Sequence, residues 1–385
     1  MKLTRLTSSF CPACYKEIPA TVSVESSGAW MDKQCSCGES TRALVEPDPI
    51  FYTHIMGMAG KGIYPGYFVD VTRVCQLRCD PCYYALEKTD PEGEFTMDAI
   101  LKDCAANRHL APFIFTGGEP TLRRDIAYLI IGASKYGPVE MITNGIKMAA
   151  QDVFEELARL LWVPGTTNLR LHLSIHAKET DKWKDVIAHC RRNDMKLMSM
   201  IFVIKSKEEF EIAFQMCQQY RDVAQSFRIK AASAIWDEQA PVNSAVVYST
   251  TERPRKIYVS DMIRWLKEMG HDVALLTQRG QKSVIVSAAV DNMFLMLVSW
   301  NDVSNVDLQD IACAPFYRAR NGEIANMVTA MLINEGWDKG FCKGIATPTR
   351  RSAEPIGARN ESGGPIMVPQ MAFPIPAMPA MPKEM

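Results

Sequence analysis

The chain has 385 residues, of which 47% are hydrophobic, 23% charged and 9% aromatic. This composition is typical of a globular chain that buries a large core, and it excludes collagen, coiled coil and wholesale disorder. Lysine and arginine number 43 against 44 aspartates and glutamates, so the net charge of -1 excludes a global basic field for nucleic acid.

The cysteines are unevenly distributed along the chain. No apolar run approaches the ~20 residues of a membrane span, and the first residues lack the apolar stretch of a secretory signal. We therefore expect no membrane span and a cytoplasmic location. Twelve cysteines are many for that compartment, where clustered thiols more often bind metal or do redox chemistry. Seven of them lie in the first 82 residues, which is where we expect metal.

Two thiol pairs open the chain, and both lie within residues 1–50. They are Cys11 with Cys14 in CPAC, and Cys35 with Cys37 in CSCG. The segment between them alternates like a β-hairpin. Two thiolate pairs at this separation form a tetrahedral site for structural zinc, and mononuclear iron remains open because both metals accept four thiolates. We expect a small metal-binding module that caps the rest of the fold.

From residue 66 the pattern changes to short apolar runs, each followed by an amphipathic stretch. Strands are predicted at 67–73, 112–116, 139–143, 169–175, 196–204 and 226–231. Helices are predicted between them at 96–108, 123–136, 152–162, 181–194 and 207–220. This alternation predicts an α/β fold with parallel strands, closed or partly closed, over residues 51–240. In such a barrel the loops after the strands carry the chemistry.

Past residue 240 the alternation stops. A helix at 255–269, a hairpin at 283–299 turning at Asp291-Asn292 and a helix at 322–335 predict an α+β extension over 241–346 that packs on the barrel. Residues 347–385 contain eight prolines and almost no periodicity, which predicts a flexible tail.

A compact thiol triplet follows the first barrel strand. Cys75, Cys79 and Cys82 form a CxxxCxxC spacing, and three thiolates can hold three corners of a cubane iron–sulfur cluster. The missing fourth ligand leaves one iron open to a substrate or cofactor. Zinc is the alternative, but a structural zinc site needs four ligands and the triplet offers no obvious fourth.

This loop resembles that of the radical S-adenosylmethionine (radical SAM) superfamily, and the resemblance covers about residues 66–235. It implies a partial (β/α)6 barrel of the TIM type. A second motif, TGGEP, follows the second strand and is similar to the family's GGEP, which binds the amino group of the cofactor's methionine part. The matching residues here are Gly117, Gly118, Glu119 and Pro120. Two glycines permit close backbone approach, and a carboxylate can meet an ammonium.

Weaker signals end the later strands. Asn144 ends the third strand and can reach the cofactor, although Asn-Gly is also an ordinary turn. Ser174 ends the fourth, where the family often places a polar contact to the ribose. For His176 we favour a histidine that is merely satisfied at a strand end. Ser199 on the fifth strand can contact adenosine or simply pack. The sequence assigns no catalytic residue.

Within the superfamily, the CPxC module followed by DVTxxCxLxCxxCY resembles the group of archaeal tetraether lipid synthases and pterin dimethyltransferases. Those relatives carry further cysteine sets, whereas only Cys313 and Cys342 occur here beyond the barrel. This departure favours single-cluster chemistry such as an isomerisation. Radical SAM isomerases of this look are encoded by phages that hypermodify thymidine in DNA, where they rearrange an N-linked glycyl group to a C-linked one.

The resemblance implies a 4Fe-4S cluster, S-adenosylmethionine (SAM), and an electron donor such as flavodoxin or ferredoxin. One electron would cleave the sulfonium, and the resulting 5'-deoxyadenosyl radical would take hydrogen from an unactivated carbon. The leading hypothesis is an isomerase acting on hypermodified thymidine, with DNA or a modified nucleotide as substrate and the host cytoplasm as location. The alternatives are a methyl or alkyl transferase or C–C coupling enzyme on a pterin or lipid, and a non-catalytic zinc-binding nucleic-acid adaptor.

Clustered cations offer limited support for a nucleic-acid substrate. They occur at 123–124, 191–192, 253–256 and 350–351 and can touch phosphates. Paired arginines are usually solvated helix ends, and we favour that interpretation.

Overall fold

A computed structural model describes most of the first 326 residues. The described ranges are 3–58, 66–72, 74–77, 79, 95–163, 166–167, 169–177, 180–231, 256–276, 285–299, 305–311, 316–318 and 324–326. Cys82, Cys313, Cys342 and the tail predicted at 347–385 lie outside them.

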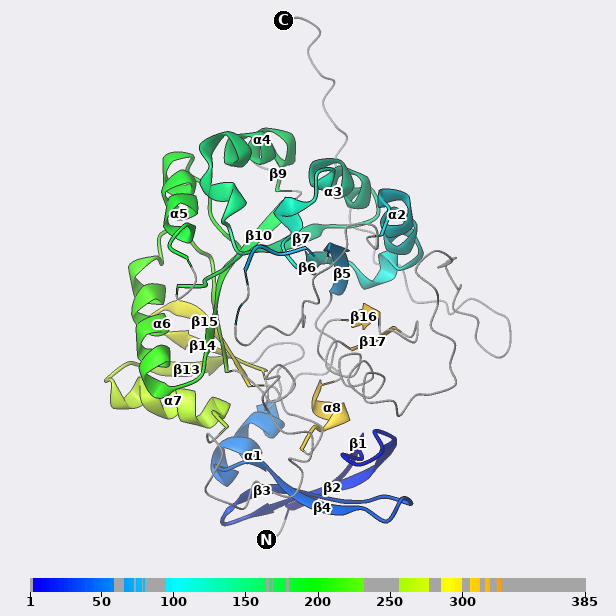
Figure 1. Ribbon diagram of the computed structural model, residues 1–385. Helices are drawn as coiled ribbons and strands as arrows, with labels where there is room; N and C mark the ends of the chain where they lie inside the picture. Colours follow the sequence, from blue (N-terminus) through cyan, green and yellow to red (C-terminus); the bar gives the residue numbers. More distant parts are fainter. Residues whose placement is uncertain are drawn as a thin grey trace, which may run out of the picture.

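The amino-terminal module is a four-stranded antiparallel sheet. Its strands follow chain order, and helix α1 (Pro49–Met58) packs against them (Figure 1). They are β1 (Leu3–Phe10), β2 (Glu17–Glu25), β3 (Gly28–Gln34) and β4 (Ser40–Glu46). Alternate side chains of β2 are buried with Met31 and Tyr52 in a small core of their own. The hairpin predicted between the cysteine pairs is confirmed as β2–β3.

All six predicted barrel strands are present, and they pair in parallel in chain order. They are β5 (Tyr67–Thr72), β6 (Phe113–Gly117), β7 (Val139–Thr143), β10 (Leu169–Ser174), β11 (Ser199–Ile204) and β12 (Phe227–Ala231). Between β7 and β10 lies a two-residue pair, β8 (Trp162–Val163) with β9 (Thr166–Thr167). The fold class is therefore confirmed as α/β with a curved, partial barrel (Figure 1).

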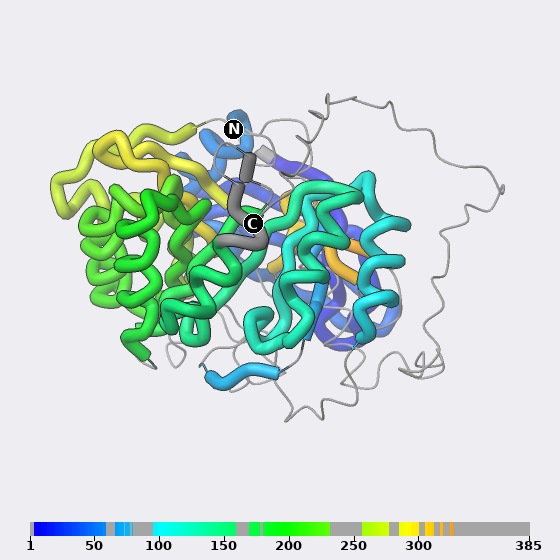
Figure 2. Tube along the Cα trace, turned by 90° about the horizontal axis from the view of Figure 1, so that it is seen from above, coloured from blue at the N-terminus to red at the C-terminus, as the bar shows by residue number. Residues whose placement is uncertain are grey.

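The five predicted helices cover the outer face of this sheet, and Figure 2 shows them side by side. They are α2 (Met97–Ala106), α3 (Ile126–Ser134), α4 (Gln151–Leu161), α5 (Trp183–Arg192) and α6 (Lys207–Gln219). Short 3-10 turns are η2 (Arg108–Leu110), η3 (Pro120–Leu122) and η4 (Lys147–Ala149). Thr96 and Ser206 begin α2 and α6 by accepting backbone N–H groups with their hydroxyls, as good N-cap residues do.

The carboxyl-terminal segments continue the large sheet at both edges. Beside β12 lies β15 (Met293–Ser299), again in parallel, followed by antiparallel β14 (Ile285–Val290) and β13 (Val273–Leu276). Beside β5 lies β16 (Phe316–Arg318), also parallel, and then antiparallel β17 (Ile324–Asn326). The extension therefore lengthens the wall of the partial barrel at both edges.

Two elements of the extension are found where predicted. The hairpin β14–β15 turns at Asp291 and Asn292, whose φ angles of 47° and 63° suit a type I′ turn. The predicted helix at 255–269 is α7 (Val259–Glu268), and a short α8 (Leu308–Ile311) follows the hairpin.

The helix predicted at 322–335 is wrong where the structure describes it. Residues 324–326 form strand β17 and pair with β16 in antiparallel register. Long-range pairing at a free sheet edge outweighs the helical propensity of this segment. Residues 327–335 lie outside the described chain.

The two faces of the large sheet carry different side chains. Successive strand residues point to opposite faces, and those facing the helices build the larger core. The concave face carries a smaller apolar cluster, which includes Phe68, Ile114 and Val298 from the sheet. Phe10 and Tyr15 of the amino-terminal module belong to that same cluster. The module therefore packs on the concave side, opposite the helices.

Glu46 joins the amino-terminal module to α7. The Ser260 hydroxyl and the Asp48 amide both donate to its carboxylate, at the end of β4. Only 2% of Glu46 is exposed, and this burial raises its pKa to about 7. A carboxyl with a raised pKa binds its proton more tightly in the folded state than in the unfolded state.

Glu46→Gln tests this linkage. The penalty for the buried charge appears as pH rises from about 4.5 through about 7, and it reaches ~3 kcal/mol above that range. The amide keeps an acceptor without the charge, so we expect a higher free energy of unfolding at pH 8.5 and little change at pH 5.5, measured by urea unfolding. Glu17→Gln, on an exposed position, is the control. Equal effects of Glu46→Gln at both pH values would contradict the assignment.

Candidate functional site

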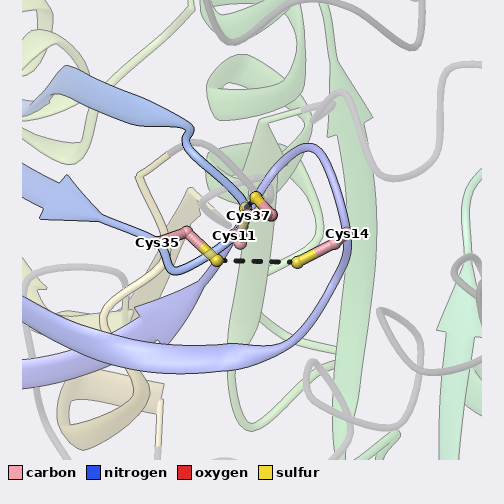
Figure 3. Close-up of side chains that lie close together, drawn as sticks. All are labelled: Cys11, Cys14, Cys35 and Cys37. Atoms are coloured by element: carbon pink, nitrogen blue, oxygen red, sulfur yellow. Dashed lines mark hydrogen bonds between the residues drawn. The ribbon is translucent and has the colours of Figure 1, made fainter.

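The four amino-terminal cysteines form a preshaped metal site (Figure 3). Their sulfur atoms all lie within 4.8 Å of one another, with 3.7 Å between Cys11 and Cys37 and 3.6 Å between Cys14 and Cys35. Tetrahedral zinc with Zn–S bonds of ~2.3 Å would place the sulfurs about 3.8 Å apart. The residues therefore fit a four-thiolate zinc ion as they stand.

The protonation of these thiols depends on burial and on local donors. Burial raises the pKa of Cys11 to about 12, whereas hydrogen bonds from Cys37, first from its backbone, lower that of Cys35 to about 7. Zinc binds thiolates, so loading the site must displace protons. Metal occupancy is consequently expected to stabilise the knuckle.

Polar contacts hold this module against α8. The Arg5 guanidinium contacts Asp307, and the Thr7 hydroxyl donates to the same carboxylate at 2.6 Å. Asp307 also accepts the backbone N–H groups at the start of α8. Because Phe10 and Tyr15 flank the knuckle and pack on the concave face, the module covers part of the barrel interior. This arrangement supports the capping role predicted for it.

Cys14→Ser tests the coupling between knuckle and barrel. We expect zinc to be lost and the free energy of unfolding to fall by several kcal/mol, because a structural metal contributes directly to folding. Zinc content is measured by atomic absorption and stability by thermal unfolding. Cys104→Ala, which removes a buried thiol of α2 far from the knuckle in sequence, should keep its zinc. Retained zinc and unchanged stability in Cys14→Ser would overturn the assignment.

The second thiol site lies at the carboxyl end of β5. Thr72 and Val74 accept hydrogen bonds from the amides of Gly118 and Glu119, each at 2.8 Å. The cysteine loop and the GGEP turn are thereby held side by side. Cys75 follows directly and accepts a long, 3.8 Å contact from the Asn144 side chain. Three predicted site elements thus meet at one edge of the sheet, as expected for the carboxyl ends of parallel strands.

Glu119 lies beneath this junction and is 1% exposed. One carboxylate oxygen accepts from the backbone and hydroxyl of Thr121 and from the Thr143 hydroxyl, and the other accepts from the Asn144 amide at 2.7 Å. Burial raises its pKa. Here Glu119 fastens the β6 turn to the β7 turn. A contact between its carboxylate and the cofactor's ammonium stays a prediction.

The backbone conformation at position 117 and a close neighbour both require glycine there. Its φ is +117°, and a Cβ atom there would lie 2.0 Å from the carbonyl oxygen of Thr72. The sequence predicts that the glycines permit the approach of a cofactor, and Gly117 also permits the close approach of the segment that leads to the cysteine loop. Pro120 is buried and begins the 3-10 turn η3.

Gly117→Ala should therefore destabilise the fold by at least ~2 kcal/mol and lower the iron retained on reconstitution, because the loop must shift. Gly270→Ala is the matched control, since Gly270 also has a positive φ, 86°, but no atom within 4 Å of an added Cβ. We expect a loss of ~1 kcal/mol there with iron unaffected. Urea unfolding and iron analysis report both effects; equal losses in the two variants would contradict the close-approach argument.

Two residues at and beyond the end of β10 are candidate site residues, Ser174 and His176. Ser174 ends this strand and is half-buried. His176, two residues further, places its Nδ1 atom 3.1 Å from the sulfur of Cys79. The sequence favoured a histidine satisfied locally, and instead its described partner is a predicted cluster ligand. Its place just beyond a strand end was the available signal.

Ser199 is fully buried and engaged within the barrel. It shares a 2.7 Å hydrogen bond with His172, whose other ring nitrogen lies 3.0 Å from Glu140. Burial lowers the pKa of His172 to about 4, so the ring is neutral at pH 7. A packing role for Ser199 is therefore directly visible, and its contact with adenosine stays a prediction.

In each arginine pair that the structure describes, at least one member has an intramolecular partner. Arg123 is buried and donates to the carbonyls of Val71 and Phe95. Arg191 lies at the end of α5, where it pairs with Asp222 at 2.8 Å. These contacts support the structural interpretation of both pairs. Arg253, Arg255 and the pair at 350–351 lie outside the described residues.

The described part of the chain contains no helix of the length and apolarity that crossing a membrane requires.

A parallel sheet with a thiol loop at its carboxyl edge, together with a separate four-thiolate knuckle, defines a metalloenzyme of the β/α-barrel class. Residues 69–217 match the radical SAM superfamily, and residues 3–45 match the HMPTM N-terminal zinc ribbon domain. The segment at 69–217 is thus similar to a radical SAM domain and the segment at 3–45 to a zinc ribbon, and the domain match implies a 4Fe-4S cluster and SAM as cofactors.

Two curated relatives and one solved structure illustrate the similarity. The 7,8-dihydro-6-hydroxymethylpterin dimethyltransferase of Methanocaldococcus jannaschii is 28% identical over 177 residues, covering 38% of this chain and 35% of the relative. The probable GTP 3',8-cyclase of Archaeoglobus fulgidus is 29% identical over 117 residues, covering 30% and 37%. This chain thus spans little more than a third of each relative's length. Streptococcus suis SuiB bound to precursor peptide SuiA matches with a TM-score of 0.46 and 12% identity, covering 73% of this chain and 63% of that chain.

Proposed function

We propose that this enzyme reductively cleaves SAM beside Cys75, Cys79 and Cys82 and uses the product to take hydrogen from an unactivated carbon of its substrate. The observation that carries the proposal is the junction of the cysteine loop, the GGEP turn and Asn144 at one sheet edge. A cluster held by three cysteines supplies one electron and an open iron for the cofactor. Flavodoxin or ferredoxin is the proposed electron donor, and the cytoplasm the proposed location.

The chain's own residues position and shield this chemistry. Asn144 is oriented by the backbone amide of Ile146, which donates to its side-chain oxygen at 3.0 Å, and by Gln76 at 3.3 Å. We assign Gly117, Gly118 and Pro120 to the cofactor's methionine part and Ser174 to its ribose. His176 is assigned to the thiolate of Cys79, where an N–H donor stabilises negative charge on sulfur. The zinc ribbon covers part of the concave face and helps to exclude water there.

For the substrate we propose hypermodified thymidine in phage DNA, on which the enzyme would move a glycyl group from nitrogen to carbon. The small number of cysteines beyond the barrel supports a reaction without auxiliary clusters. In an isomerisation the rearranged substrate radical would recover a hydrogen atom from 5'-deoxyadenosine, which regenerates the cofactor, so no net oxidant or reductant is needed. The relatives named as a methyltransferase and a cyclase keep transfer or coupling on a pterin-like ring as the second candidate.

Cys79→Ala tests the radical assignment. Anaerobically purified protein should be brown, absorb broadly near ~400 nm and release 5'-deoxyadenosine when given dithionite and SAM. We expect Cys79→Ala to lose both the colour and the product. Cys217→Ala, which alters a buried thiol of α6, should keep both. Colourless wild-type protein that contains only zinc would support a non-catalytic adaptor instead.

In the same assay, the amount of SAM consumed per product separates the two reaction classes. An isomerase recycles the cofactor, whereas a transferase consumes at least one molecule for each product. Mass analysis of phage DNA made with and without the gene identifies the base that is modified.

A further inference from the structure

Two cations point into the barrel from β12. Phe227, Ile229 and Ala231 of this strand belong to the core between the sheet and the helices. Because side chains alternate along a strand, Arg228 and Lys230 lie on the opposite, concave face. Both are only partly exposed there.

Neither cation has a hydrogen bond or ion pair with any residue that the structure describes. The nearby carboxylate, Glu140, is already engaged by His172 at 3.0 Å and Arg170 at 3.3 Å. Burial also lowers the pKa of Lys230 to about 8, with Arg228 as the second cause. Cations inside a fold are ordinarily paired, because an uncompensated buried charge is costly. The two cations therefore lack a partner anion from the described protein, and a bound ligand can supply it.

The position of β12 separates this site from the cofactor's own anion. Strand pairing places Arg228 in one row with Ile201 and Ser174, and Lys230 lies two residues nearer the carboxyl edge. β12 is three strands from β7, which is roughly 14 Å along the sheet. The cysteine loop follows β5, which lies on the far side of β7 from β12, and the proposed SAM site is at that loop. The two cations therefore face the space that is left for the substrate.

We propose that Arg228 and Lys230 bind a phosphate group of a nucleotide substrate at the barrel mouth. A guanidinium offers a planar fork of N–H donors and an ammonium a compact charge, and together they match the negative charge and several oxygens of a phosphate. The phosphate can belong to a free nucleotide or to a DNA chain. This inference rests on the proposed function and specifies the substrate class of the same site.

The test compares Arg228→Gln/Lys230→Gln with Arg221→Gln/Lys267→Gln, which removes the same two charges from exposed helix and loop positions. Reconstituted proteins are titrated with thymidine 5'-monophosphate, GTP, a short oligothymidylate and the neutral nucleosides. We expect wild type and control to bind at least one phosphorylated probe more tightly than its nucleoside. The inward double variant should lose ~10-fold or more of that affinity for the phosphorylated probe. Affinity for SAM, measured by equilibrium dialysis, should stay within about twofold.

The outcomes show whether Arg228 and Lys230 bind a phosphate and which molecule carries it. Preference for oligothymidylate identifies a DNA chain as the source of the phosphate, and preference for a mononucleotide identifies a free nucleotide. The proposal is overturned if phosphorylated probes bind no better than nucleosides, if the inward variant binds them as wild type does, or if it loses affinity for SAM instead. Failure of the proposed function would show separately, as wild-type protein that forms no 5'-deoxyadenosine.

Discussion

The arrangement of the cofactor edge depends on the contact between the end of β5 and the turn after β6. Two backbone hydrogen bonds from Gly118 and Glu119 hold the segment that leads to Cys75, and the missing side chain of Gly117 makes the approach possible. The buried carboxylate of Glu119 then extends the same connection to β7. Three strand ends thus share one hydrogen-bonded unit, in which a polar network is fully satisfied and therefore rigid.

This unit explains how a short motif can do two tasks. The GGEP turn is expected to meet the cofactor, and its contacts within the protein also hold the neighbouring strand ends together. Positioning comes first, because a cysteine loop without this support would not present its sulfurs in one place. The zinc ribbon has a comparable role on the concave side, where Phe10 and Tyr15 close part of the interior.

Much of this organisation could be predicted from local patterns in the sequence. Six strands alternating with helices, the thiol pairs and the Asp291-Asn292 turn all follow from short-range signals, and the structure contains each of them. The strand at 324–326 could not be predicted in this way, since its identity depends on pairing with β16 at a free edge. For the same reason the sequence did not indicate that β15 and β16 extend the sheet.

Contacts between distant residues were equally out of reach. His176 and Cys79 are 97 positions apart, and no spacing rule connects them. Arg228 and Lys230 could have been identified from the sequence. A central parallel strand is usually apolar on both faces, whereas the sequence of β12, FRIKA, contains two cations. The two cations at inward positions of this strand point to the interior space that the proposed phosphate would occupy.

The chain builds its barrel wall from two separate portions of sequence. The strands that carry the cofactor edge are consecutive, whereas β15 and β16, which flank them, are supplied by the last hundred residues that the structure describes. Variation in these flanking strands can change the shape of the barrel interior without changing the cofactor edge. Changes confined to β15 and β16 would therefore alter which substrate the barrel accepts while the proposed SAM site stays the same.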